Sequence, residues 1–213
     1  MLTNTTGMES KAKLIYIGDP MCSWCYGFAD EITSAKAQLE EKVDFEMVMG
    51  GLRPYSTEPI KQMKSFLKDH WSHVYEKSNQ PFSYEILDAD SIVYDTEPPC
   101  RAVVTIRELS PENEFDYFKA VQKAFYAENK NPNLTKTYRE LAVEFGVDSA
   151  EFEGKFTSGE MVTRVREDFD RSAEMGIGGF PSVILQVHGK RIFIAHGYTT
   201  AKDIVEKVNK ALN

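Results

Sequence analysis

Cys22 and Cys25 enclose a Ser-Trp pair shortly after an apolar run at residues 14–17. The run predicts a buried strand, and the residues from Trp24 onward predict a helix, so the cysteines fall where a strand passes into a helix. A helix N-terminus carries partial positive charge and unpaired N–H groups, which stabilise a thiolate. Because a thiolate is the nucleophile in disulfide exchange, we expect Cys22 to be an exposed, acidic redox thiol and Cys25, one turn further on, to be buried.

A metal site is the main structural alternative, because half of a zinc site has the same Cys-x-x-Cys spacing. The other candidate ligands do not complete such a site. The third cysteine, Cys100, has no partner at a suitable spacing, and nothing connects the His70 and His73 pair with Cys22. We therefore predict a redox pair rather than a metal site, with neither metal nor cofactor, while structural cysteines remain an alternative.

The composition narrows the possible partners. The chain has 33 acidic and 25 basic residues and a formal net charge of −8, which argues against nucleic acid and anionic membranes. No signal peptide and no membrane-spanning apolar run is visible in the sequence, so we expect a cytoplasmic protein. In a reducing compartment, three cysteines are not expected to form a structural disulfide framework. The oligomeric state stays open.

The order of the predicted elements indicates an α/β fold. Residues 13–17 and 43–49 predict strands on either side of a helix at 24–41, and such a β-α-β unit implies parallel strands. Near the C-terminus, residues 182–195 predict a β-hairpin. A closing helix is predicted at 199–212, with Thr199 or Thr200 as its N-cap.

The middle of the chain, from about residue 57 to 175, is predicted to be helical. One stretch, 79–95, is predicted to be irregular, with an extended piece at 84–87. Helices are expected at 58–77, 98–109, 110–129, 135–145, 149–156 and 160–175.

A resemblance to a known family rests on two motifs: Cys-Ser-Trp-Cys, and Gly-Gly-Phe-Pro-Ser-Val at residues 178–183. Together they resemble the DsbA-like branch of the thioredoxin superfamily, and residues 19–28 are most similar to its cytoplasmic, FrnE-like members. The resemblance implies a thioredoxin-like fold (β-α-β … β-β-α) formed by residues 13–56 and 176–213, with an inserted α-helical domain at 57–175.

The resemblance also implies roles for three residues. Cys22 is similar to the cysteine that attacks a substrate disulfide, and Cys25 is similar to the cysteine that resolves the mixed disulfide. Pro181 matches the proline that lies opposite the cysteines and is usually cis.

Substrate-binding roles are implied for the residues around these three. Ser23 and Trp24 form the variable pair that tunes the redox potential, and Trp24 either stacks on substrates or packs on the helical insertion. The backbone of Phe180 is expected to pair with an extended substrate. One position differs from the family: many members carry a buried carboxylate six residues before the first cysteine, where this chain has Tyr16. Proton transfer at the second cysteine then needs another group, a water molecule or Asp19.

Other candidate residues are expected to have structural roles. We predict that Cys100 is a buried, inert thiol that lies too far from Cys22 to form a disulfide with it. His70 and His73 are expected to be solvated on a helix surface, and His196 is expected to end the last strand.

The expected function is thiol–disulfide exchange through a mixed disulfide, with protein or low-molecular-weight thiols and disulfides, glutathione among them, as substrates. One alternative is a glutathione-dependent isomerase or transferase acting on a small aromatic substrate. Such relatives typically have Ser at the position of Cys22, so the cysteine pair disfavours this alternative. The other alternative is a redox-sensing adaptor protein. The redox direction does not follow from the sequence.

Overall fold

A four-stranded mixed sheet lies at the centre of the computed structural model, which describes residues 11–213. The strands are β1 (Ala12–Gly18), β2 (Val43–Met49), β3 (Ser182–Val187) and β4 (Lys190–His196). Their spatial order is β2-β1-β3-β4, in which β1 and β2 are parallel and the other neighbours are antiparallel. The predicted β-α-β unit, the C-terminal hairpin and the α/β, thioredoxin-like fold class are confirmed.

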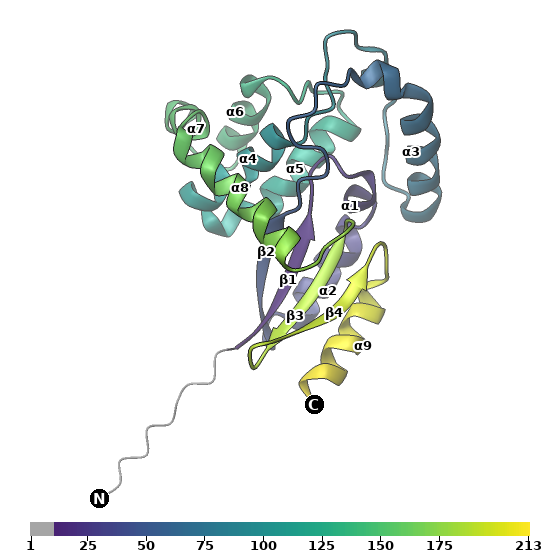
Figure 1. Cartoon of the computed structure of the whole chain (residues 1–213), viewed down its shortest axis with the longest axis vertical. Coiled ribbons are helices and arrows are strands. Elements are labelled where there is room, and N and C mark those ends of the chain that lie inside the picture. Colours follow the sequence, from purple (N-terminus) through teal and green to yellow (C-terminus); the bar gives the residue numbers. More distant parts are fainter. Residues whose placement is uncertain (1–10) are drawn as a thin grey trace, which may run out of the picture.

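Most of the helices lie between β2 and β3 in the sequence, and α4 to α8 gather beyond one end of the sheet (Figure 1). The α-helices of the described segment are α1 (Ser23–Gly27), α2 (Ala29–Leu39), α3 (Lys64–Ser78), α4 (Glu97–Leu109), α5 (Glu114–Tyr126), α6 (Thr135–Glu144), α7 (Ser149–Phe156), α8 (Gly159–Glu174) and α9 (Ala201–Leu212). Short 3₁₀ turns occur at η1 (Ile60–Met63), η2 (Glu85–Asp88) and η3 (Pro111–Asn113). The helical nature of the middle of the chain is thus confirmed.

Strand β1 is buried on both faces, as expected for a central strand covered by helices. Leu14 and Tyr16 belong to the large hydrophobic core that α2 and α9 cover, whereas Ile15 and Ile17 belong to a smaller cluster with Met175 at the end of α8. The large core continues into α4 to α8, so apolar packing joins the inserted helices to the sheet. The loop that follows β1 therefore begins at the junction between sheet and inserted helices.

Two predicted elements are corrected by the structure. The helix predicted at 24–41 is divided at Phe28, whose buried ring packs against Tyr16 and Tyr198 at centroid distances of 6.0 and 6.1 Å. The extended piece predicted at 84–87 instead belongs to the region of the 3₁₀ turn η2. Ile86 and Leu87 are both buried there, which neighbouring residues of a half-buried strand cannot be, since their side chains point to opposite faces.

Candidate active site

The two cysteines lie at the start of α1, directly after the loop that leaves β1. Cys22 is the N-cap residue, its carbonyl accepts a 3.0 Å hydrogen bond from the N–H of Tyr26, and Cys25 lies within the helix. Both are free thiols, with Cys22 6% exposed and Cys25 fully buried. Cys25 is buried, as predicted, but the expectation that Cys22 is exposed is wrong, because the loop that contains Phe180 covers it.

The loop before β3 covers Cys22 from the opposite side. The Phe180–Pro181 peptide bond is cis, as the resemblance implied. The thiol of Cys22 donates to the carbonyl oxygen of Phe180 across 3.6 Å, so the two motifs found in the sequence meet in space. The carbonyl of Pro181 accepts a 2.7 Å hydrogen bond from the N–H of Gly197, which holds this loop against the end of β4.

Asp19 fixes the loop that precedes Cys22. Its buried carboxylate accepts hydrogen bonds from the N–H groups of Met21 (2.8 Å) and Leu52 (2.7 Å). Burial raises the pKa of Asp19, while these hydrogen bonds oppose that rise. Because Leu52 follows β2, Asp19 connects the cysteine loop with the neighbouring loop at the same end of the sheet.

Cys100 is buried, as predicted, but it makes a polar contact that the sequence did not indicate. Cys100 is fully buried in α4, but its thiol donates to the carboxylate of Asp19 at 3.5 Å. Burial, and then the charge of Asp19, raise the pKa of Cys100 well above its usual value. Cys100 therefore stays a neutral thiol that helps to hold Asp19.

A cavity of about 350 Å³ opens beside Cys22. Its wall includes Trp24 and Phe180, and its rim carries the exposed side chains of Leu52 and Phe66 (39% and 62% exposed). An apolar cleft next to a nucleophile is the arrangement expected of a substrate site.

His70 belongs to this cavity, so the expectation that it is solvated on a helix surface is wrong. It is half-buried on α3, and Trp24 meets it edge-on at a centroid distance of 6.0 Å. Burial, followed by the charge of His73, lowers the pKa of His70, so it is neutral over more of the pH range than an ordinary histidine. Trp24 contacts His70 of the inserted helix, which is one of the two roles considered for it, and it also lines the cavity.

Further cavity residues come from segments that no sequence motif marked. Arg53 and Tyr94 line the cavity from the loops on either side of α3 and η2. The hydroxyl of Tyr94 donates to the carbonyl of Met21, and the guanidinium of Arg53 pairs with Glu58. These residues are polar or aromatic but have no spacing that relates them to the cysteines, so only the fold reveals them.

Residues elsewhere do not add to this site. His196 contacts Ser182, with 3.2 Å between Nδ1 and Oγ, and ends β4 as expected, while His73 is exposed. Within residues 11–213, no group of three or more His, Cys, Asp or Glu side chains is arranged to hold a metal ion. None of the helices in that segment is long and apolar enough to cross a membrane.

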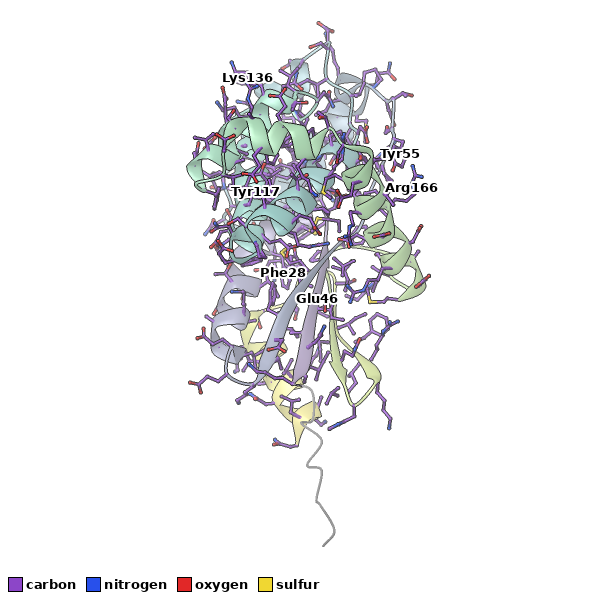
Figure 2. The ribbon with its side chains drawn as sticks, turned by 90° about the vertical axis from the view of Figure 1, so that its left-hand side faces the viewer. Phe28, Glu46, Tyr55, Tyr117, Lys136 and Arg166 are labelled. Atoms are coloured by element: carbon purple, nitrogen blue, oxygen red, sulfur yellow. The ribbon has the colours of Figure 1, made fainter. Side chains whose placement is uncertain are left out.

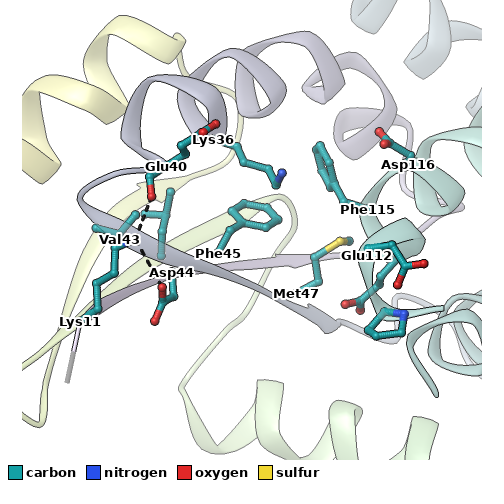
Figure 3. Close-up of a pocket in the computed structure, with 13 residues that line it drawn as sticks. Lys11, Lys36, Glu40, Val43, Asp44, Phe45, Met47, Glu112, Phe115 and Asp116 are labelled. Atoms are coloured by element: carbon teal, nitrogen blue, oxygen red, sulfur yellow. Dashed lines mark hydrogen bonds and ion pairs between the residues drawn. The ribbon is translucent and has the colours of Figure 1, made fainter. Parts of the chain in front are cut away.

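A second cavity, of about 480 Å³, lies against β2, and no cysteine lines it (Figure 3). The ammonium group of Lys36 lies over the rings of Phe45 and Phe115, 5.6 and 5.7 Å from their centroids. None of the residues that line it also lines the cavity beside Cys22. The cavity beside Cys22 is therefore the better candidate for the active site.

Gly50 gives a direct test of how closely the site is packed. A Cβ atom at residue 50 would lie 2.2 Å from the ring of Phe180, so Gly50→Ala must displace that ring. We expect the variant to lose about 1–3 kcal/mol of stability in urea unfolding, as overpacked sites do. Gly154→Ala is the control, because nothing lies within 4 Å of that position in α7 and alanine favours a helix. Equal unfolding midpoints for the two variants would contradict the packing of Phe180 on Gly50.

Comparison with known proteins agrees with this geometry. The family of DSBA-like thioredoxin domains matches residues 15–207. A proposed protein disulfide isomerase from Nitrosomonas europaea is 32% identical, with a TM-score of 0.86, over 95% of this chain and 98% of that chain. Comparison with curated proteins gave no match.

Two further solved structures share the fold. The cytosolic disulfide reductase DsbM from Pseudomonas aeruginosa is 22% identical, with a TM-score of 0.78, over 94% of this chain and 98% of that chain. DsbM solved with glutathione is 21% identical, with a TM-score of 0.76 and the same coverage. Since the family match spans nearly all of the described residues, the chain belongs to the DSBA-like thioredoxin domain family of disulfide oxidoreductases.

Proposed function

We propose that Cys22 and Cys25 exchange disulfides with substrates through a mixed disulfide on Cys22. The observation that carries the proposal is the placement of Cys22 between the 350 Å³ cavity and the Phe180 carbonyl, with the fully buried Cys25 behind it in α1. The Cys22 thiolate attacks one sulfur of a substrate disulfide, and the other sulfur leaves as a thiolate. Cys25 then attacks Cys22, forms the Cys22–Cys25 disulfide and releases the second substrate thiol.

The cavity supports a peptide-like substrate of low molecular weight, for which glutathione disulfide is the proposed example. Its apolar rim suits the aliphatic part of such a ligand, and Arg53 provides a cation for a carboxylate. Ser23, Trp24 and the backbone of Phe180 are the proposed substrate contacts. The structure of DsbM with glutathione supports the choice of this substrate.

A reducing, cytoplasmic role is the proposed setting. DsbM, which shares the fold, is described as a cytosolic disulfide reductase. A thiol reductant other than glutathione, with a potential below that of the glutathione pair, would return the Cys22–Cys25 disulfide to the dithiol and so drive the cycle toward reduction of glutathione disulfide.

Trapping with glutathione disulfide tests the proposal. Cys25→Ser is expected to retain one glutathione per chain, because the resolving thiol is gone, whereas Cys22→Ser is expected to retain none. Intact-mass spectrometry after acid quenching measures the adduct, and peptide mapping locates it. A glutathione adduct on Cys22→Ser and none on Cys25→Ser would reverse the proposed roles, and no adduct on either variant would overturn the mechanism.

A further inference from the structure

Tyr16 has a hydroxyl group that the packing leaves without a partner. The side chain is fully buried in β1, and no hydrogen bond of ordinary geometry satisfies its hydroxyl. Leaving a buried hydroxyl unpaired costs free energy, and most such groups in proteins find a partner. The hydroxyl at residue 16 is therefore an exception that needs an explanation.

The ring of Tyr16 points along β1 toward the cysteine loop. A Cβ atom at residue 18 would lie 2.9 Å from both Cζ and the hydroxyl oxygen of Tyr16, so the missing side chain of Gly18 makes room for the tip of the ring. Phe28, three residues after Cys25, and Phe118 of α5 hold the ring, at centroid distances of 6.0 and 5.8 Å. Aromatic packing fixes the position of the ring, and the hydroxyl lies beside Gly18, at the start of the loop that leads to the cysteines.

Cys25 is the acceptor available in that region. It is fully buried in the same hydrophobic core as Tyr16, and the two groups lie close enough for each to shift the pKa of the other. A neutral thiol is a weak acceptor, which fits the absence of a regular hydrogen bond to the Tyr16 hydroxyl when Cys25 is protonated. A thiolate is a much stronger acceptor, because hydrogen bonds to an ionised group are shorter and stronger.

We propose that the Tyr16 hydroxyl donates a hydrogen bond to the Cys25 thiolate and so stabilises it during the resolving step. This inference rests on the proposed function, and it names the group that assists the second step of the mechanism, in which Cys25 attacks Cys22. Cys25 loses its proton to solvent, the Cys25 thiolate attacks Cys22, the bond from Cys22 to the substrate sulfur breaks, and the released thiolate takes up a proton. Tyr16 keeps its own proton throughout.

The surroundings of Cys25 and Tyr16 shift the pKa of each group in the direction that this role requires. Burial raises the pKa of Cys25 well above its usual value, and the neighbouring Cys22 raises it further. A hydrogen bond from the Asp19 backbone lowers the pKa of Cys25, and so does the Tyr16 hydroxyl, which can donate to Cys25 once that thiol is ionised. Burial first, and then Cys25, Cys22 and Asp19, raise the pKa of Tyr16, so Tyr16 stays protonated and remains a donor.

Tyr16→Phe tests the proposal, since it removes the hydroxyl and keeps the ring. Reduced protein is mixed with glutathione disulfide, and acid-quenched samples are followed by intact-mass spectrometry as the Cys22 adduct forms and decays. We expect adduct formation at the normal rate and decay about tenfold slower at neutral pH, with the pH profile of decay displaced upward by about one pH unit. Thermal unfolding should not show a loss of stability, because the hydroxyl has no partner to lose.

Tyr117→Phe is the matched control. Tyr117 is fully buried, but its hydroxyl donates a 2.8 Å hydrogen bond to the carbonyl of Tyr138 in the inserted helices. This variant should unfold at a lower temperature and resolve the adduct at the normal rate, which is the opposite of the pattern expected for Tyr16→Phe. Normal adduct formation with unchanged decay in Tyr16→Phe would overturn this inference alone. Failure of the adduct to form in the unsubstituted protein would overturn the proposed function, and this inference with it.

Discussion

Cys22→Ser is expected to abolish disulfide exchange, with a loss of at least about a thousandfold in the rate of substrate reduction, as for other variants that lack the nucleophile. Serine is close in size to cysteine, but its hydroxyl is not ionised near neutral pH and forms no mixed disulfide. Because the carbonyl of Phe180 already accepts a hydrogen bond from residue 22, serine keeps a donor there and the fold should be retained. The measurement is reduction of glutathione disulfide by the reduced protein, followed as release of free thiol.

Cys100→Ser is the control for that experiment. Cys100 donates to Asp19, and a serine hydroxyl at the same position can donate to the same carboxylate. The variant should therefore keep full exchange activity, as the sequence predicts for a thiol that takes no part in the redox chemistry. A large loss of activity in Cys100→Ser would imply that a third cysteine takes part, and retained activity in Cys22→Ser would remove the nucleophile from the proposed mechanism.

The sheet and most helices could be predicted because their signals are local. Val43 to Met49 alternates as a strand and forms β2 with the predicted bounds, and the predicted helix at 149–156 matches α7. Thr200, one of the two predicted N-caps, accepts the N–H of Asp203 at the start of α9. In these segments periodicity, turn residues and capping all favour the same element.

Tertiary packing explains where the predictions failed. Phe28 has the spacing of a helix interior, but burial of its ring against Tyr16 and Tyr198 coincides with the division between α1 and α2. Residues 84–87 were predicted to include an extended piece, but two adjacent apolar residues are buried together in a 3₁₀ turn. In both places the partner residues are distant in sequence, so no local pattern contains the information.

Only the part of the candidate site that the two motifs form could be predicted from the sequence. The Cys-Ser-Trp-Cys and Gly-Gly-Phe-Pro-Ser-Val segments identified Cys22 and Phe180, and the structure brings them together. The opposite side of the cavity comes from the inserted segment, through residues such as His70 and Tyr94. The packing of the insertion decides which face of α3 meets the cysteines. Of the two histidines predicted on the surface of that helix, His70 therefore lines the cavity, whereas His73 is exposed.

A largely buried cluster of charges adds to the apolar packing between the inserted helices and the sheet, and it has no sequence motif. Arg107 of α4 binds the carboxylate of Asp168 of α8 through two hydrogen bonds, at 3.0 and 2.8 Å, and Glu114 of α5 at 2.7 Å. The same two side chains, at residues 107 and 168, also bind β2: Arg107 donates to the carbonyl of Met47, and Asp168 accepts from the N–H of Met49. Since β2 is the edge strand, this cluster satisfies backbone groups that no neighbouring strand can pair.

The surroundings of this cluster contrast with the exposed face of the inserted helices. Tyr55, just beyond β2, lies beside Arg166 of α8 at the surface (Figure 2), with the guanidinium carbon 5.9 Å from the ring centroid. Two residues later on the same helix, Asp168 is buried. Position on the helix face therefore decides whether a charge on α8 contributes to the stability of the fold.

Asp168→Ala is expected to destabilise the protein by about 3 kcal/mol, because it leaves the Met49 N–H without an acceptor and removes two of the hydrogen bonds of the largely buried Arg107 guanidinium. The thermal midpoint should fall by roughly 10 °C for a chain of this size. Calorimetry or urea unfolding measures the change. Glu140→Ala removes the same kind of charge from the exposed Lys136–Glu140 pair and should alter stability by less than about 1 kcal/mol.

Loss of exchange activity should accompany the loss of stability in Asp168→Ala. Met49 is followed directly by Gly50, which packs against the ring of Phe180, and by the loop whose Leu52 N–H binds Asp19. Loosening the end of β2 is therefore expected to disturb the surroundings of Cys22 through two contacts, one with Phe180 and one with Asp19. If Asp168→Ala and Glu140→Ala unfold at the same temperature, the buried cluster does not hold the inserted helices on the sheet, and apolar packing alone accounts for their attachment.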